Sequence, residues 1–299
     1  MQRIAVLLVG GMTIVGQPGA AQQAAGTALW RLAATTLPLP PALATGTAAV
    51  FWNPAQIEDS ARTQLGLEAI QTPAAIGASG MLAAMRIRAG KVGQIGFVYG
   101  HVGLSDLTRT GDSPDPVGSP VPVYTFALGA TWSRPVAGTA LGATLAYHET
   151  RLDLAHASRW TIDLGASREV APGVRLAAAT HFFSSFSASD PAQDVYAGVE
   201  VRLWQGPLWG DRGVLRGRYG IAFGHGFTAD HQIGAGLEVN RVFALDLGVA
   251  REGGYSAGGW RPAAGVRISI GKYRVTVARD AGVNELGSAY RVGVDARFR

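Results

Sequence analysis

Apolar side chains recur at every second position over most of this chain, and that period constrains the fold more than any other feature. From Tyr124 to Trp132 the apolar positions alternate with Thr, Ala and Gly, and from Tyr290 to Phe298 they alternate with Arg, Gly and Asp. Successive side chains of a strand point to opposite faces of a sheet. The pattern therefore predicts strands that have one apolar and one polar face.

The period continues from Thr63 to the end of the chain and predicts fourteen strands. Most of them are 9–13 residues long. The mean strand of a soluble protein has about 5–6 residues, whereas a strand that crosses a bilayer has ~9–11. The predicted strands are 63–71, 77–88, 92–103, 122–133, 138–152, 158–169, 173–184, 194–204, 213–225, 230–239, 242–251, 260–270, 272–280 and 288–298.

The first 21 residues have the parts of a secretory signal peptide. Met1-Gln2-Arg3 is a basic start, residues 4–15 are apolar, and small residues follow up to Ala21. The apolar run is too short for a membrane anchor helix, so we expect it to be removed on export. The predicted organisation is a signal peptide (1–21), an N-terminal plug or hatch segment (22–62) and a transmembrane barrel (63–299).

The predicted connections fall into two alternating classes. Short periplasmic turns that alternate with longer external loops are typical of bacterial outer-membrane barrels. A soluble β-sandwich or propeller would show the same period, so strand length, loop asymmetry and the export signal decide against it. We predict an all-β fold, a 14-stranded antiparallel transmembrane β-barrel in the outer membrane of a Gram-negative-type cell. The short class is 89–91, 135–137, 170–172, 240–241 and 271, with the longer 204–212 as its exception, and the long class includes 104–121, 185–193 and 252–259.

Composition narrows the classes of function. Charged residues make up 16% of the chain, against roughly 25% in soluble globular proteins. No run of about 18 uncharged apolar residues follows the export signal, so no membrane-spanning helix is expected. The chain contains no Cys, which excludes disulfides, thiolate metal sites and Cys nucleophiles. Its formal net charge of +5 fits an anionic partner or, better, an arginine-lined pore.

The stretch Phe51-Trp52-Asn53-Pro54-Ala55 has the most specific local chemistry ahead of the first strand. Asn is a favoured N-cap, Pro fits the first helical position, and Gln56 at the third position can bond back to the cap. We predict a short helix from Pro54 to about residue 61 and a second short helical piece over residues 27–34. This segment is expected to sit in the lumen as a plug.

The polar face of the strands carries ten arginines and six acidic residues, which would line the lumen. An arginine on the lipid face near the midplane would cost roughly 2–4 kcal/mol. One interpretation is a structural ladder of cross-strand ion pairs that hold the barrel and its plug, and the other is a lumen that favours anions. The candidate lumen-lining residues are Arg175, Glu200, Arg202, Arg216, Arg218, Glu238, Asp246, Arg267, Arg274, Arg291, Asp295 and Arg297.

No catalytic, cofactor or nucleic-acid motif emerges, and we predict no enzyme activity. His181 and Ser184 are the one candidate catalytic pair, but no orienting acid is evident. His225 and His231 with Asp230 lack a recognisable metal-ligand spacing. We therefore predict no catalytic residues, no metal and no cofactor.

The stretch 44–55, Ala-Thr-Gly-Thr-Ala-Ala-Val-Phe-Trp-Asn-Pro-Ala, resembles the N-terminal motif of the FadL-like outer-membrane superfamily, including its PorV/PorQ branch. That resemblance implies a 14-stranded barrel with an N-terminal segment in the lumen. In the FadL branch it implies passive transport of small, hydrophobic molecules. In the PorV/PorQ branch it implies a role in protein secretion or surface attachment. The expected partners are outer-membrane lipids and either a small hydrophobic ligand or a secreted or surface protein.

Overall fold

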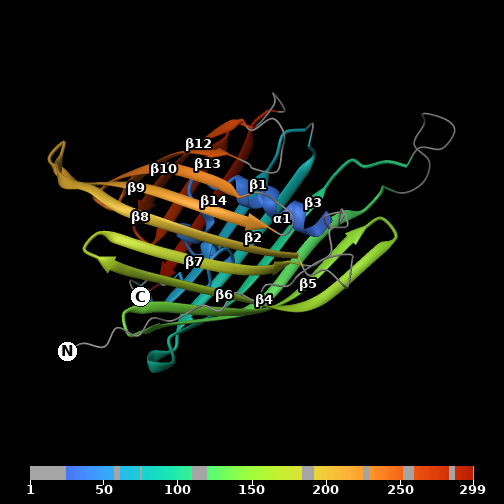
Figure 1. The fold of residues 1–299 in the computed structure, drawn as a ribbon, viewed down its shortest axis with the longest axis horizontal. Coiled ribbons are helices and arrows are strands. Elements are labelled where there is room, and N and C mark those ends of the chain that lie inside the picture. The colour runs from blue at the N-terminus through green and yellow to red at the C-terminus, as the bar shows by residue number, and fades with distance from the viewer. Residues whose placement is uncertain are drawn as a thin grey trace.

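In the computed structural model, the strands of the chain form one closed antiparallel barrel around an N-terminal segment (Figure 1). The structure describes residues 25–56, 61–74, 76–109, 120–183, 192–224, 229–251, 259–282 and 287–298. The N-terminal segment contains α1 (Ala25–Thr35) and the 3-10 turns η1 (Pro41–Leu43) and η2 (Ala48–Phe51), and a third 3-10 turn, η3 (Gly90–Val92), lies between two strands.

The described residues contain fourteen strands, as predicted. They are β1 (Thr63–Gln71), β2 (Ala78–Arg88), β3 (Gln94–Leu104), β4 (Val123–Val136), β5 (Thr139–Leu152), β6 (Ala155–Ala171), β7 (Val174–Phe183), β8 (Ala192–Leu208), β9 (Asp211–Gly224), β10 (Asp230–Val239), β11 (Phe243–Arg251), β12 (Trp260–Ile270), β13 (Tyr273–Asp280) and β14 (Ala289–Phe298).

Each strand pairs with its neighbours in sequence, and β1 closes the barrel on β14. The closing register runs from Thr63 opposite Phe298 to Gln71 opposite Tyr290, over the whole of β1. Closure leaves no unpaired edge between the first and last strands, which is the condition for a sheet to span a bilayer.

The connection predicted at residues 204–212 as an exception is a tight turn instead. β8 continues to Leu208 and β9 begins at Asp211. Trp209 and Gly210 between them have φ of 52° and 86°, the positive values of a two-residue hairpin turn. A bulge between Arg202 and Trp204 had hidden the strand period at this point in the sequence.

We call the two ends of the barrel the tight-turn end and the long-loop end. The tight-turn end carries the connections β2–β3, β4–β5, β6–β7, β8–β9, β10–β11 and β12–β13, of which the longest spans residues 89–93. The long loops predicted at 104–121, 185–193 and 252–259 belong to the opposite end and lie largely outside the described residues.

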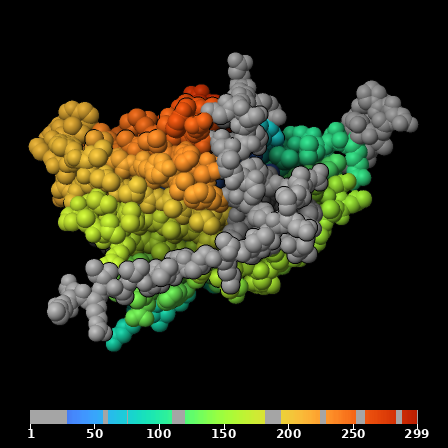
Figure 2. Space-filling model, in the orientation of Figure 1, coloured from blue at the N-terminus to red at the C-terminus, as the bar shows by residue number. Residues whose placement is uncertain are grey.

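The apolar face of the strands points outward and the polar face inward. Leu128 and Leu145 on neighbouring strands are 53% and 50% exposed, whereas Thr131 and Thr144, which face each other on the same two strands, are buried. Figure 2 shows the outer wall as one continuous surface over the yellow and orange strands. An apolar outer band with a polar interior is the reverse of a soluble barrel and is the arrangement of a transmembrane one. Among the described residues, no helix is both long enough and apolar enough to cross a membrane.

The hydrophobic core lies inside the barrel and is formed mainly by the N-terminal segment. Trp30, Leu43, Val50 and Trp52 have no solvent exposure. α1 lies within the ring of strands, against β3, β4, β5 and β7 (Figure 1). α1 also covers the helical piece expected at residues 27–34. The lumen is therefore filled where this segment crosses it.

Candidate functional site

Inward-facing glycines of the wall make room for the N-terminal segment. A Cβ atom at Gly198 would lie 2.8 Å from Cγ of Leu43, and one at Gly100 would lie 2.6 Å from Cη2 of Trp30. Real Cβ atoms do not approach other heavy atoms so closely, so these strands carry glycine where the segment passes. Four more wall glycines, Gly142, Gly165, Gly220 and Gly265, face Pro54, Asn53, Pro40 and Pro38 in the same way.

The stretch 51–55, which we call the hinge, is a turn in the structure and does not begin a helix. Asn53 is fully buried, its Nδ2 donates to the Ala42 carbonyl at 2.9 Å, and its Oδ1 accepts from the Ala55 N–H at 3.0 Å. The Gln56 side chain donates to the Ala42 carbonyl at 3.1 Å instead of bonding back to the cap. The helix predicted to begin at Pro54 is therefore wrong in its first turn, and residues 57–60 lie outside the described part.

Five ring side chains, which we call the aromatic cluster, meet in the lumen where the hinge crosses it. Phe51 lies 4.8 Å from Trp30 and 5.1 Å from Trp52 between ring centroids. Two residues of the wall complete the cluster, because the ring of Tyr196 lies 5.5 Å from that of His181 and 6.5 Å from that of Trp52. All five are buried. Tilted and edge-to-face pairs at such distances stabilise one another beyond their burial.

His181 links the hinge to the wall, a role that sequence reasoning missed. Its Nε2 donates to the Trp52 carbonyl at 2.6 Å, and its Nδ1 lies 3.2 Å from Oδ2 of Asp163 on the next strand. The strand period places Asp163 and His181 on the inner face, but only the fold places the imidazole of His181 between Asp163 and the Trp52 carbonyl. The other member of the candidate catalytic pair, Ser184, lies outside the described residues, as does His225 of the candidate metal group.

The ladder between β6 and β7 ends beside this link. Backbone pairing runs from Ala171–Val174 to Leu164–Thr180 and stops there. Beyond that point residues 161–163 of β6 face 181–183 of β7, where Asp163 and His181 approach to 3.2 Å and both strands stay paired with their other neighbours. We call this interval the β6–β7 seam. Since His181 belongs both to the seam and to the aromatic cluster, the cluster adjoins this part of the wall.

Two predicted lumen residues on β14 hold the N-terminal segment. Arg291 donates to the Ala33 carbonyl at 2.6 Å and to Thr36 Oγ1 at 3.0 Å, and it pairs with Glu68. Asp295 accepts the Thr47 N–H at 2.7 Å. Arg31 with Asp194, and Arg86 with the Gln56 carbonyl, fasten the segment at two more places.

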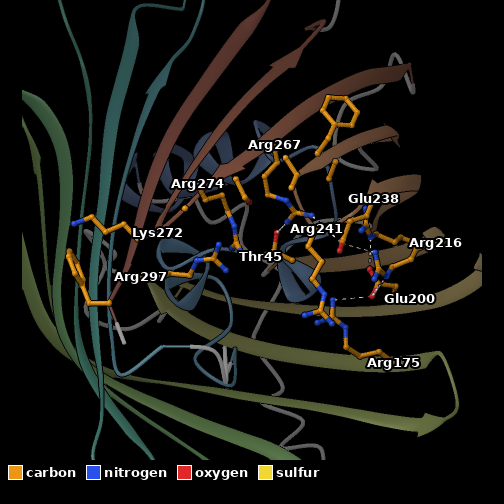
Figure 3. A pocket seen from close by; sticks show the side chains of 17 residues that line it. Thr45, Arg175, Glu200, Arg216, Glu238, Arg241, Arg267, Lys272, Arg274 and Arg297 are labelled. Carbon is orange, nitrogen blue, oxygen red and sulfur yellow. Dashed lines mark hydrogen bonds and ion pairs between the residues drawn. The ribbon is translucent and has the colours of Figure 1, made fainter. Parts of the chain in front are cut away.

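At the tight-turn end, the lumen contains a cavity of about 870 Å³ that we call the arginine chamber (Figure 3). Its two glutamates and the adjacent Asp246 form ion pairs with the arginines: Arg218 lies 2.7 Å from Glu200 and 2.5 Å from Asp246, and Arg216 lies 3.0 Å from Glu238. The chamber also reaches the N-terminal segment at Thr45. Its arginines are Arg175, Arg216, Arg218, Arg241, Arg267, Arg274 and Arg297.

The structure brings most of the candidate lumen residues together in this chamber and separates two of them from it. Arg291 lies apart, against α1. Arg202 is exposed and lies next to the bulge of β8. It lines an adjoining cavity of about 440 Å³, where its Nη1 donates to Oε1 of Gln205 at 3.3 Å. Asp246 and Asp295 are ion-pair partners of chamber arginines, with Asp295 4.0 Å from Arg274. Arg241 was not among the candidates because it belongs to a turn, and the alternation of apolar and polar residues assigns a face only to strand residues.

Comparison with known proteins finds similarity in fold only. No family model and no curated protein sequence matches the chain. The toluene transporter TbuX of Ralstonia pickettii is similar with a TM-score of 0.52 and 14% identity, covering 86% of this chain and 96% of that one. The toluene transporter TodX of Pseudomonas putida is similar with a TM-score of 0.52 and 13% identity, covering 84% and 92%. A deltaS2 mutant of the TodX monoaromatic hydrocarbon channel has a TM-score of 0.54, at 13% identity and 85% and 95% coverage. The chain therefore has the fold of 14-stranded outer-membrane barrels of this type.

Proposed function

We propose that this protein is a passive channel of the outer membrane for small hydrophobic molecules. The observation that carries the proposal is the position of the aromatic cluster, which fills the lumen beside the β6–β7 seam. Aromatic side chains with a few placed polar groups are the usual contacts of small apolar ligands. In the proposed route a solute passes over the cluster and leaves through the seam into the bilayer.

The level at which the hinge crosses the lumen favours an apolar solute over a hydrated one. The hinge crosses the barrel with Asn53 and Trp52 fully buried, so the centre of the lumen is occupied by packed protein. Its polar groups are bonded to the wall and to Ala42. A wide water-filled pore would instead require a polar path past this segment. The similarity in fold to toluene transporters and a monoaromatic hydrocarbon channel is consistent with the same class of solute.

Uptake of toluene by intact cells tests the proposal, because the lipopolysaccharide leaflet of such cells slows apolar solutes. We expect the initial rate to rise on expression of the protein, compared with an empty vector, while uptake of a neutral sugar stays unchanged. The idea fails if folded barrel is present in the membrane and toluene uptake does not rise. It also fails if the sugar enters as readily, which would indicate a water-filled pore.

A double substitution, Asp163→Cys with His181→Cys, tests the seam as the exit. The two side chains approach to 3.2 Å across the strands, and the chain contains no other Cys. Oxidation to the disulfide is expected to lower toluene uptake, and reduction of the same cells to restore it. Equal uptake in both states would rule out the seam as the exit.

A partner in protein secretion or surface attachment remains a prediction of the family resemblance.

A further inference from the structure

The arginine chamber carries more positive charge than its own carboxylates can neutralise. Seven arginines line it, against two lining glutamates, Glu200 and Glu238. Adding the two aspartates that pair with chamber arginines, Asp246 and Asp295, gives four carboxylates. Seven minus four leaves an excess of three positive charges in a recess of the lumen. Low-dielectric walls strengthen the field of such a recess and concentrate anions in it.

Two of these arginines have no carboxylate partner within ion-pair distance in the described chain. Arg241 is the second residue of the β10–β11 turn, where Asn240 and Arg241 have φ of 52° and 59°, and the turn is closed by the Val242 N–H on the Val239 carbonyl at 3.0 Å. Arg297 is held through its backbone N–H, which donates to the Lys272 carbonyl at 2.9 Å. Their backbones are thus fixed while their guanidinium groups are available to a ligand.

The side chains of Arg241 and Arg297 point into the same cavity, from the turn and from the last strand (Figure 3). Lys272 also lines the cavity and is left out of the charge count, because its Nζ lies over two rings, 5.2 Å from the centroid of Tyr273 and 5.0 Å from that of Phe298. The excess charge is therefore presented by guanidinium groups, which bind carboxylate and phosphate oxygens in a bidentate manner.

We propose that the arginine chamber is a binding site for a small organic polyanion that carries phosphate or carboxylate groups. The volume of about 870 Å³ matches a small-molecule site better than a single ion, because such sites span about 300–1,000 Å³. Arg241 and Arg297 are the principal ligands, and the already paired arginines supply the surrounding field. The ligand also reaches the plug, because Thr45 lines the chamber and its hydroxyl accepts from Nη1 of Arg267 at 2.7 Å.

Calorimetric titration of the full-length protein in detergent tests this proposal, with inorganic pyrophosphate and citrate as probes at constant ionic strength. We expect both probes to bind, and sodium chloride to give no saturable signal. A response to pyrophosphate alone would narrow the ligand to phosphate compounds. Each of Arg241→Gln and Arg297→Gln should weaken binding by roughly tenfold or more, since a charged hydrogen bond is lost. A difference in gel mobility between heated and unheated samples of each variant checks that the barrel is folded.

Arg134→Gln is the matched control, because Arg134 is exposed near the tight-turn end of β4 and does not line the chamber. It removes the same charge from the same end of the molecule and should bind both probes as the wild type does. Absence of saturable binding by the wild type, or equal weakening by all three substitutions, would overturn the proposal. Toluene uptake is measured separately, so failure of one proposal leaves the other standing.

Discussion

Replacement of Gly165 by valine should loosen the plug without opening the barrel wall. Gly165 lies on β6 and faces the hinge, where an added Cβ would come within 2.9 Å of the Ala55 nitrogen and of Cδ of Pro54 and would collide with Oδ1 of Asn53. The hinge must move, because a wall strand is held on both sides by its neighbours. Valine is itself a favoured strand residue, so β6 should pair as before.

The size of the effect follows from the contacts that the hinge would lose. Overpacking of a close-packed site costs about 1–3 kcal/mol. Asn53 would also give up its hydrogen bonds to Ala42 and Ala55, now 2.9 and 3.0 Å long, each worth about 0.5–1.5 kcal/mol net. We therefore expect the free energy of opening the plug to fall by about 3 kcal/mol, which is roughly a hundredfold rise in the open population.

Thiol labelling of a single Cys in the plug measures that population. The chain has no Cys of its own, and Ala49, only 2% exposed, is the position for Ala49→Cys. When the plug recloses faster than the reagent reacts, the labelling rate is proportional to the open population. In the Gly165→Val background the rate should rise roughly a hundredfold.

Gly217→Val combined with Ala49→Cys, without the Gly165→Val change, is the control. Gly217 lies on the outward face of β9, where an added Cβ meets only the Leu203 side chain at 3.2 Å. The labelling rate of this control should stay close to that of Ala49→Cys alone. If Gly165→Val labels no faster than Gly217→Val, the fit between wall glycines and hinge does not hold the plug, and the reasoning is refuted.

Three further substitutions test the anchors and the lipid face. Trp52→Ala, which empties a fully buried site, should lower the stability of the docked plug by about 3–5 kcal/mol; unchanged labelling at Ala49→Cys would contradict this. Arg291→Lys keeps the charge beside Glu68 but loses the guanidinium group that also bonds the Ala33 carbonyl. Trypsin should then cut after Arg31 faster than in the wild type, and an unchanged rate would argue against Arg291 as an anchor of α1. Leu128→Arg, at a site 53% exposed on the outer face of β4, should lower the free energy of folding into phospholipid vesicles by about 2–4 kcal/mol relative to Leu128→Ala, and equal values would argue against a lipid-facing wall.

The strands were predictable from the sequence because each one carries its own period-two signal. That signal depends only on neighbouring residues, so the fourteen strands and the alternation of turns could be derived locally. It failed at Trp204, where a bulge shifts the period by one residue and the turn at Trp209 supplies no Gly-Asn or Asn-Gly pair.

The interior of the barrel was less predictable, because it depends on contacts between segments far apart in the chain. Asn53 and Pro54 carry a genuine helix-start signal, yet the Ala42 carbonyl competes for the same side chains and a turn results. The contact of His181 with the Trp52 carbonyl spans 129 residues. No local pattern encodes such a contact, so the aromatic cluster and the seam became visible only in the fold.

The central claim is that the N-terminal segment is packed inside the barrel, since it supplies three rings of the aromatic cluster, bonds to His181 at the seam and reaches the chamber at Thr45. Hydrogen exchange of the wild-type protein in lipid, followed by mass spectrometry, tests this claim most directly. The Thr47 N–H is bonded to Asp295 at 2.7 Å and the Trp52 N–H to the Ala49 carbonyl at 2.9 Å, both in buried surroundings. We predict that residues 41–53 exchange as slowly as the strands of the wall. Exchange of these residues at the rate of an unstructured peptide, while the strands stay protected, would contradict the account.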